Sequence, residues 1–182
     1  MQEIVLASSS ITRAELLTKF GVPFIQRDAG FDEEQLSLVD PSHFVYHATK
    51  GKMNSYLEQY DLSLPVLCAD TVVTANGEIL RKAKDVDDAR RILELQSGNT
   101  VSILTCMIYK TSSYELIDLA ATHYLFHTFD KDALDAYLES DEWRGKAGAC
   151  MVEGFCKSYI RDVKGLESTA MGLSVERLLP FL

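Results

Sequence analysis

Asp70 is the residue whose surroundings most strongly suggest chemistry. It follows the apolar run Val66–Ala69 and precedes Thr71-Val72-Val73, so the sequence predicts a carboxylate inside an otherwise apolar strand. Burying a carboxylate is costly unless the group is paired or binds a metal. Strand-end carboxylates often act as metal ligands or as bases. A structural hydrogen bond to a turn or a helix end would explain the same pattern, and both interpretations stay open.

A serine-rich loop supplies the second candidate group. Ser8, Ser9 and Ser10 precede a predicted helix that carries Arg13 near its start. Backbone N–H groups at a helix N-terminus bind anions, and hydroxyl groups with a guanidinium suit phosphate oxygens. The serines could equally serve as helix caps, with Arg13 a surface residue.

Three further charged segments could complete an anion site. Lys52 lies on the apolar stripe of a predicted helix, so its amine either extends to solvent or meets an anion in a cleft. Lys82, with its basic neighbours Arg81 and Lys84, could neutralise a triphosphate or could lie on a solvated edge strand. Glu33, in an acidic triplet over residues 32–34, offers a second carboxylate or belongs to an acidic surface.

The elements that must position these residues can be read from the spacing of apolar residues and from cap signals. The capping-box pattern at Thr12–Glu15 predicts the start of a helix. Asp40-Pro41 predicts the start of a second helix, and Asn76-Gly77 predicts a tight hairpin. We expect an α/β fold with a mixed, partly antiparallel sheet, as a single domain over residues 1–182. Strands are expected near residues 4–7, 65–75, 101–109, 115–129 and 159–163, and helices near 12–20, 40–60, 85–98, 130–138 and after 174.

Composition narrows the possible functions. The chain has 182 residues and a net charge of -9, which disfavours stable binding to nucleic acid. No apolar run is long enough to span a bilayer, and no signal peptide is recognised, so we expect a cytoplasmic protein without a membrane partner. Of the four cysteines, Cys68 and Cys106 should be buried thiols. Neither a zinc site nor a disulfide framework is expected.

Taken together, the motifs resemble the Maf family of nucleotide pyrophosphatases over essentially the whole chain. The first match is Leu6–Ser10 with Arg13–Leu17, and the second is Ala69–Val73. Further matches are Lys82 with Asp85, Ser97-Gly98, Thr105, Lys146–Ala149, Glu153-Gly154 and Gly172-Leu173. Each motif is short, but their common order and spacing make a chance agreement improbable.

The resemblance implies a function and a site. It implies two lobes similar to the inosine triphosphatase group with a central cleft, and hydrolysis of nucleoside triphosphates to monophosphate and diphosphate. Asp70 would be the catalytic base, and Mg²⁺ or Mn²⁺ the cofactor, held by Asp70 and Glu33. A homodimer is also implied. The expected phosphate-binding residues are Ser8, Ser10, Arg13, Glu33, Lys52 and Lys82.

The same resemblance points to three specificity residues, Thr12, Thr71 and Glu153. Two motifs, Asp70-Thr71 and Lys146-Ala147-Gly148, resemble the branch of the family that prefers dTTP and UTP, whereas the single residue Glu153 resembles the branch that prefers 7-methyl-GTP. Thr12 stands where an arginine is usual. We expect a pyrimidine preference and a role in division arrest or in excluding modified nucleotides. The alternatives are a non-catalytic, nucleotide-binding regulator of septum formation and a 7-methyl-GTP pyrophosphatase.

Overall fold

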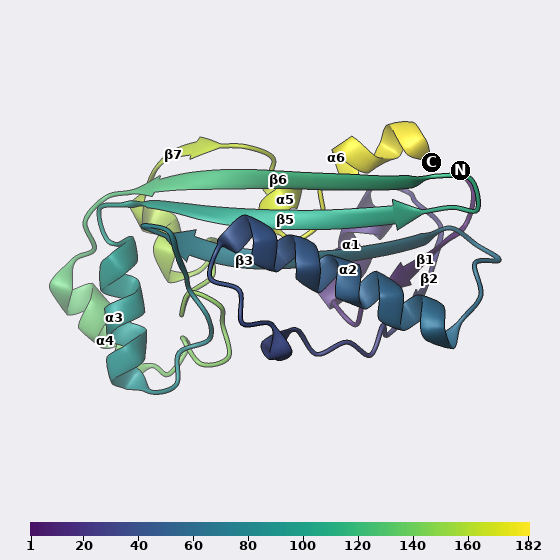
Figure 1. Cartoon of the computed structure of the whole chain (residues 1–182). Helices are drawn as coiled ribbons and strands as arrows, with labels where there is room; N and C mark the ends of the chain where they lie inside the picture. The colour runs from purple at the N-terminus through teal and green to yellow at the C-terminus, as the bar shows by residue number, and fades with distance from the viewer. The chain divides into compact units, whose positions relative to one another are not determined.

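The structure is a computed structural model that describes the backbone of residues 1–182 and every side chain other than that of residue 34. The chain divides into two compact units. The first comprises residues 1–71, 104–121 and 166–182, and the second comprises residues 72–103 and 122–165. Three long strands, β3 (Val66–Ala75), β5 (Thr100–Lys110) and β6 (Glu115–Phe126), contribute residues to both units (Figure 1).

In the first unit, two short parallel strands extend the sheet beyond β3. Strand β1 (Ile4–Ala7) pairs in parallel with β2 (Phe24–Arg27) and with β3, and the order continues through β5 to β6. The remaining elements of this unit are helices: α1 (Ile11–Lys19), η1 (Glu33–Gln35), α2 (Pro41–Gln59), α5 (Glu167–Ala170), α6 (Val175–Leu178) and η3 (Leu179–Phe181).

The two faces of this sheet are covered by different helices. One face of the sheet forms a hydrophobic core with α1 and the C-terminal segment. This core contains Ile4, Leu6, Leu16, Leu17, Leu67, Ala69, Met107, Tyr109, Leu173, Val175 and Leu178. Successive strand residues point to opposite faces, so the intervening residues of β3 and β5 face the other side. There α2 packs, with Thr49 Oγ1 3.3 Å from the carbonyl oxygen of Cys106. Asp70 consequently points toward α2 and Thr71 toward α1.

The second unit contains β4 (Glu78–Ile79), α3 (Val86–Gln96), α4 (Lys131–Glu139), η2 (Phe155–Tyr159) and β7 (Ile160–Lys164). Strand β4 returns antiparallel to β3 through Asn76 and Gly77, both at positive φ, and β7 pairs antiparallel with β6. Helices α3 and α4 are joined by an ion pair of 2.6 Å between Arg90 and Asp135.

Most sequence-based expectations about the elements are confirmed. The sheet is mixed, with parallel and antiparallel pairs, and Asp40, Asp85 and Asp130 cap α2, α3 and α4. The described part of the chain contains no helix both long and apolar enough to cross a membrane. The single-domain assignment over residues 1–182 stays a prediction.

Three expectations need correction. Helix α1 begins at Ile11 with Ser10 as its cap, not at Thr12, because the Ser10 hydroxyl accepts the Arg13 amide at 3.3 Å. Strand β2 was not expected, because three of its four residues are exposed and its apolar pattern is weak. Cys150 and Cys156 form a disulfide, although the sequence indicated none. Cys68 and Cys106 are buried thiols, as expected.

Candidate functional site

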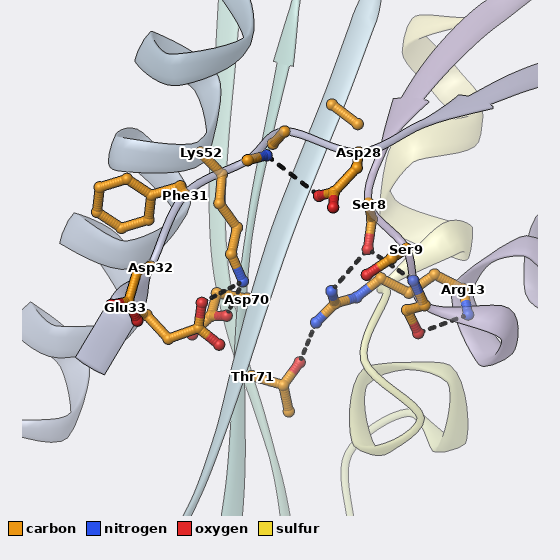
Figure 2. Close-up of a pocket in the computed structure, with 14 residues that line it drawn as sticks. Ser8, Ser9, Arg13, Asp28, Phe31, Asp32, Glu33, Lys52, Asp70 and Thr71 are labelled. Carbon is orange, nitrogen blue, oxygen red and sulfur yellow. Dashed lines mark hydrogen bonds and ion pairs between the residues drawn. The ribbon is translucent and has the colours of Figure 1, made fainter. Parts of the chain in front are cut away.

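A pocket of about 670 Å³ opens beside the end of β1 and the middle of β3, and all fourteen residues that line it belong to the first unit. Its walls are the loop after β1, the first turn of α1, the segment over residues 28–33, one residue of α2 and the middle of β3 (Figure 2). This volume lies in the range of small-molecule sites. Seven predicted site residues meet here: Ser8, Ser10, Arg13, Glu33, Lys52, Asp70 and Thr71.

One side of the pocket is an acid–lysine cluster. Lys52 Nζ lies 2.5 Å from Asp70 Oδ1 and 3.5 Å from Glu33 Oε2. The side chains of Asp70 and Lys52 are only 8% and 14% exposed, whereas that of Glu33 is 42% exposed. Lys52 therefore meets carboxylates in a cleft, which decides between the two interpretations of its place on α2.

Burial makes Asp70 a stronger base than a solvated carboxylate. Loss of water raises its pKa above the ordinary value, and the charges of Lys52 and Arg13 offset part of this rise. A raised pKa brings a carboxylate closer to the range in which general bases operate near neutral pH. Asp70 thus combines a buried position with access to the pocket.

The other side of the pocket is organised around Arg13. Its guanidinium donates from Nε to the Gly172 carbonyl at 2.8 Å, from Nη1 to Ser8 Oγ at 3.2 Å, and from Nη2 to Thr71 Oγ1 at 3.2 Å. Among the described side chains, no carboxylate lies within ion-pair distance of it. Burial lowers its pKa, with Asp70 acting in the opposite direction, but an arginine keeps its charge in proteins. A buried cation with only neutral partners is suited to an anionic ligand.

Ser8 is set to donate a hydrogen bond into the same corner. Its hydroxyl oxygen already accepts from the Ser10 amide and from Arg13 Nη1, both at 3.2 Å. With two acceptor positions used, the remaining function of this hydroxyl is its own O–H donor. The Gln26 amide holds the loop by donating to the Ser8 carbonyl at 2.8 Å. Ser8, Arg13 and the N-terminus of α1 can therefore bind phosphate oxygens together.

The charges that line the pocket indicate how a polyanion could bind. Two cationic side chains, Arg13 and Lys52, face four carboxylates, Asp28, Asp32, Glu33 and Asp70, an excess of two negative charges among the described lining residues. A triphosphate would meet net repulsion unless cations accompany it. Asp70 and Glu33 already converge on one cation, the Lys52 ammonium. The donor set thus fits a hard divalent cation with oxygen ligands.

The two carboxylates alone would not complete the coordination of a divalent cation. Within the described residues, no group of three or more His, Cys, Asp or Glu side chains is arranged to hold a metal. A Mg²⁺ ion commonly binds through one or two carboxylates and takes its other ligands from phosphate and water. Two converging carboxylates are compatible with that mode.

Three predicted residues lie outside the pocket lining. Lys82 and Glu153 belong to the second unit, where Lys82 forms an isolated antiparallel bridge with Ala147. Glu153 lies in the loop closed by the disulfide of Cys150. Thr12 is in the first turn of α1, half-buried. Their proposed roles in phosphate binding and specificity stay predictions.

Sequence reasoning assigned no role to several residues that shape the pocket. Asp28 and Phe31 line it from a segment without regular structure, where no periodic signal is available. The Gly172 carbonyl, which fixes Arg13, lies 159 positions away from it in the chain. Only the motif match at Gly172-Leu173 could have drawn attention to that position.

The fold and the pocket together define an α/β protein whose pocket combines a buried arginine with an acid–lysine cluster. The family model described as "Maf-like protein" matches residues 3–182, and the chain belongs to the Maf family. The resemblance seen in the sequence is thereby confirmed.

Curated relatives cover nearly the whole chain. A protein of a Nitratiruptor species is 57% identical over 177 residues, covering 96% of each chain. One of Helicobacter pylori (strain J99) is 38% identical over 177 residues, covering 97% of this chain and 93% of its own. Both are named nucleoside triphosphate pyrophosphatase. The solved structure of the Staphylococcus aureus Ham1 protein aligns with a TM-score of 0.46 at 10% identity, over 69% of this chain and 72% of that one. That likeness is too weak to support a conclusion.

Proposed function

We propose that this protein is a nucleoside triphosphate pyrophosphatase, which hydrolyses its substrate between the α- and β-phosphates to a nucleoside monophosphate and diphosphate. The observation that carries the proposal is the buried Arg13 guanidinium, held by neutral partners opposite the Asp70–Lys52 pair. The names of the close relatives support the same activity. The proposal includes a preference for pyrimidine triphosphates, a cytoplasmic location and a homodimer.

In the proposed reaction, the arginine side of the pocket binds the phosphate chain. Arg13 and the Ser8 hydroxyl bind phosphate oxygens, assisted by backbone N–H groups at the start of α1. Asp70, which lines the pocket, accepts the proton of the water that attacks phosphorus. Lys52, 2.5 Å from that carboxylate, orients it and screens the charge that develops on the phosphate.

We further propose that a divalent cation, Mg²⁺ or Mn²⁺, binds at Asp70 and Glu33. The negative excess of the pocket lining and the convergence of both carboxylates on one cation support this assignment. When bound, such a cation neutralises phosphate charge and polarises the phosphoryl group. The chain's own residues supply binding, orientation and the proton acceptor.

Product analysis tests the proposal directly. The purified protein is incubated with UTP and Mg²⁺, and the products are separated by anion-exchange chromatography. Uridine monophosphate and pyrophosphate in equal amounts are expected, and Asp70→Asn should slow their release by ~10²–10⁴-fold. Asp61→Asn serves as a matched control, because Asp61 is exposed and lies outside the pocket.

Two results would contradict the proposal. Uridine diphosphate with orthophosphate as the main products would mean attack at the γ-phosphate. Tight UTP binding without any product would favour the non-catalytic regulator instead.

A further inference from the structure

A row of hydroxyl groups lies behind Arg13, on the face of the sheet that packs against α1. Arg13 Nη2 is 3.2 Å from Thr71 Oγ1, which is 2.9 Å from Thr105 Oγ1. Thr105 Oγ1 in turn donates to the Thr169 carbonyl at 2.7 Å. The four groups come from α1, β3, β5 and the C-terminal segment, all within the first unit. Thr105 is fully buried and does not line the pocket.

The direction of every hydrogen bond in this row is fixed by its last member. A carbonyl oxygen only accepts, and a threonine hydroxyl has a single hydrogen. The Thr105 hydrogen is therefore used on the Thr169 carbonyl, so Thr105 must accept from Thr71. The Thr71 hydrogen is used in that bond, which leaves Thr71 an acceptor toward Arg13.

We propose that Thr105 is a positioning residue for Arg13, and that it acts by making the Thr71 hydroxyl an acceptor only. The inference rests on the proposed function of this pocket. With its hydrogen used on Thr105, Thr71 holds the guanidinium in place and offers phosphate oxygens no donor. Phosphate is left to Arg13 and to Ser8, whose hydroxyl keeps its hydrogen available. A ligand atom that contacts Thr71 must itself be a donor, such as a hydroxyl or an N–H group.

The C-terminal segment holds the other end of the guanidinium in a matching way. The Gly172 carbonyl accepts from Arg13 Nε at 2.8 Å. Gly172 has φ +103°, and a Cβ at this position would lie 3.2 Å from Thr71 Oγ1 and 3.3 Å from Arg13 Nε. A side chain there is disfavoured both by the backbone conformation and by the close approach. Two backbone carbonyls therefore hold Arg13 in place. The Gly172 carbonyl accepts from it directly, and the Thr169 carbonyl acts through the hydroxyls of Thr105 and Thr71.

The chain offers a matched control for the loss of a buried threonine hydroxyl. Thr49 is also fully buried in the first unit, and its hydroxyl contacts the carbonyls of Val45 and Cys106 at 2.7 and 3.3 Å. It is not connected to Arg13 or to any residue that lines the pocket through these bonds. Thr49→Val and Thr105→Val each delete one buried hydroxyl bonded to a carbonyl, so both should lower Tm to a similar extent.

The experiment compares full-length variants in steady-state hydrolysis of UTP with Mg²⁺, and in calorimetric binding of inorganic pyrophosphate with Mg²⁺. For Thr105→Val we expect KM and the pyrophosphate Kd to rise about tenfold, the effect of one misplaced hydrogen bond to a charged group, with a much smaller change in kcat. Thr105→Ser keeps the hydroxyl and should restore both constants. Thr49→Val should leave them unchanged. If Thr105→Val does not fold, Thr105→Cys, a much weaker donor of similar size, replaces it.

A double variant tests whether Thr105 acts through Thr71. In the Thr71→Val background, Thr105→Val should change KM no further, because the relayed contact is already absent. A further tenfold rise would overturn the inference, and so would a Thr105→Val protein with the same KM and Kd as Thr49→Val.

The proposed function and this inference can fail separately. A wild-type protein that releases no pyrophosphate from any nucleoside triphosphate overturns the proposed function. The calorimetric Kd still decides the role of Thr105 in that case. Binding of pyrophosphate about tenfold weaker in Thr105→Val than in Thr49→Val supports the inference, and equal binding overturns it.

Discussion

A glycine in the middle of α2 allows a sharp test of how the pocket wall is built. Gly51 precedes Lys52, and an interior helical glycine costs about 1 kcal/mol relative to alanine. The space around it explains its presence, because a Cβ at Gly51 would lie 2.2 Å from Cζ of Phe31 and 2.5 and 2.6 Å from its two Cε atoms. Phe31 lines the pocket two positions before Glu33. We therefore expect this contact to position the segment that carries Glu33.

The effect of Gly51→Ala on the free energy of unfolding follows from these distances. Carbon atoms in contact lie about 3.5 Å apart, so the ring of Phe31, now 2.2 Å away from the new Cβ, must withdraw by about 1.3 Å. Overpacking of this kind costs about 1–3 kcal/mol, while the gain in helix propensity is about 1 kcal/mol. The free energy of unfolding should therefore fall by about 0–2 kcal/mol.

The sign of the effect should reverse when the ring is removed. In a Phe31→Ala background only the propensity term is left, so Gly51→Ala should stabilise by about 1 kcal/mol. Urea unfolding of the four proteins at constant pH gives the coupling between the two positions, expected at about 1–3 kcal/mol. Asn54→Ala, at an exposed position of the same helix, controls for helix propensity.

The activity of the same variants connects this contact with the site. Because Glu33 follows Phe31 in a short segment, Gly51→Ala and Phe31→Ala should each lower kcat/KM for UTP, whereas Asn54→Ala should not. Stabilisation by about 1 kcal/mol in both backgrounds, with unchanged activity, would refute the reasoning. It would show that the position of the Phe31 ring does not require a glycine at position 51.

Four further predictions concern Asp70, the divalent cation and the choice of base. Asp70→Asn should lower kcat by ~10²–10⁴-fold through loss of the base. Burial raises the pKa of Asp70 in the folded protein, so folding favours its protonated form. The contribution of this protonated carboxyl to the free energy of unfolding is complete below the unfolded-state pKa. It is lost as pH rises through the folded-state pKa. The Asn variant should hence have a higher Tm than the wild type at pH 7 and the same Tm near pH 3, and a lower Tm at pH 7 contradicts this. Turnover should stop in excess chelator and return with Mg²⁺ or Mn²⁺; full activity in chelator removes the metal from the proposal. Glu153→Gln and Thr12→Arg should each raise the ratio of kcat/KM for UTP over 7-methyl-GTP, by about 1–3 kcal/mol in transition-state binding. An unchanged ratio would show that neither position affects the choice of base.

Local signals in the sequence predicted most of the elements. Asp40-Pro41 and Asp85 cap helices because a side-chain oxygen meets an unpaired amide in the first turn, which depends only on neighbouring residues. Asn76 and Gly77 accept positive φ, so the hairpin needs no distant contact. The start of α1 was misplaced because serine and threonine are both good caps, and their choice is decided by which hydroxyl reaches an amide.

The candidate site was predictable in part. The apolar run around Asp70 indicated a buried carboxylate, and Ser8 and Arg13 indicated a phosphate loop. The sequence left open whether Lys52 reaches solvent or a cleft. Its contacts with Asp70 and Glu33 depend on how α2 packs against the sheet, which no local pattern encodes.

Strand geometry marks the boundary between what the sequence determined and what the tertiary structure decided. Because strand residues alternate, the sequence alone requires Asp70 and Thr71 to point to opposite faces of β3. Asp70 meets Lys52 because α2 packs on one face of the sheet. Thr71 meets Arg13 because α1 packs on the other face. Thr105 reaches the same corner through long-range contacts, 34 residues from Thr71 and 64 from Thr169. A contact over such a separation depends on the whole packed core, so the sequence specified the chemical groups and the tertiary structure specified their partners.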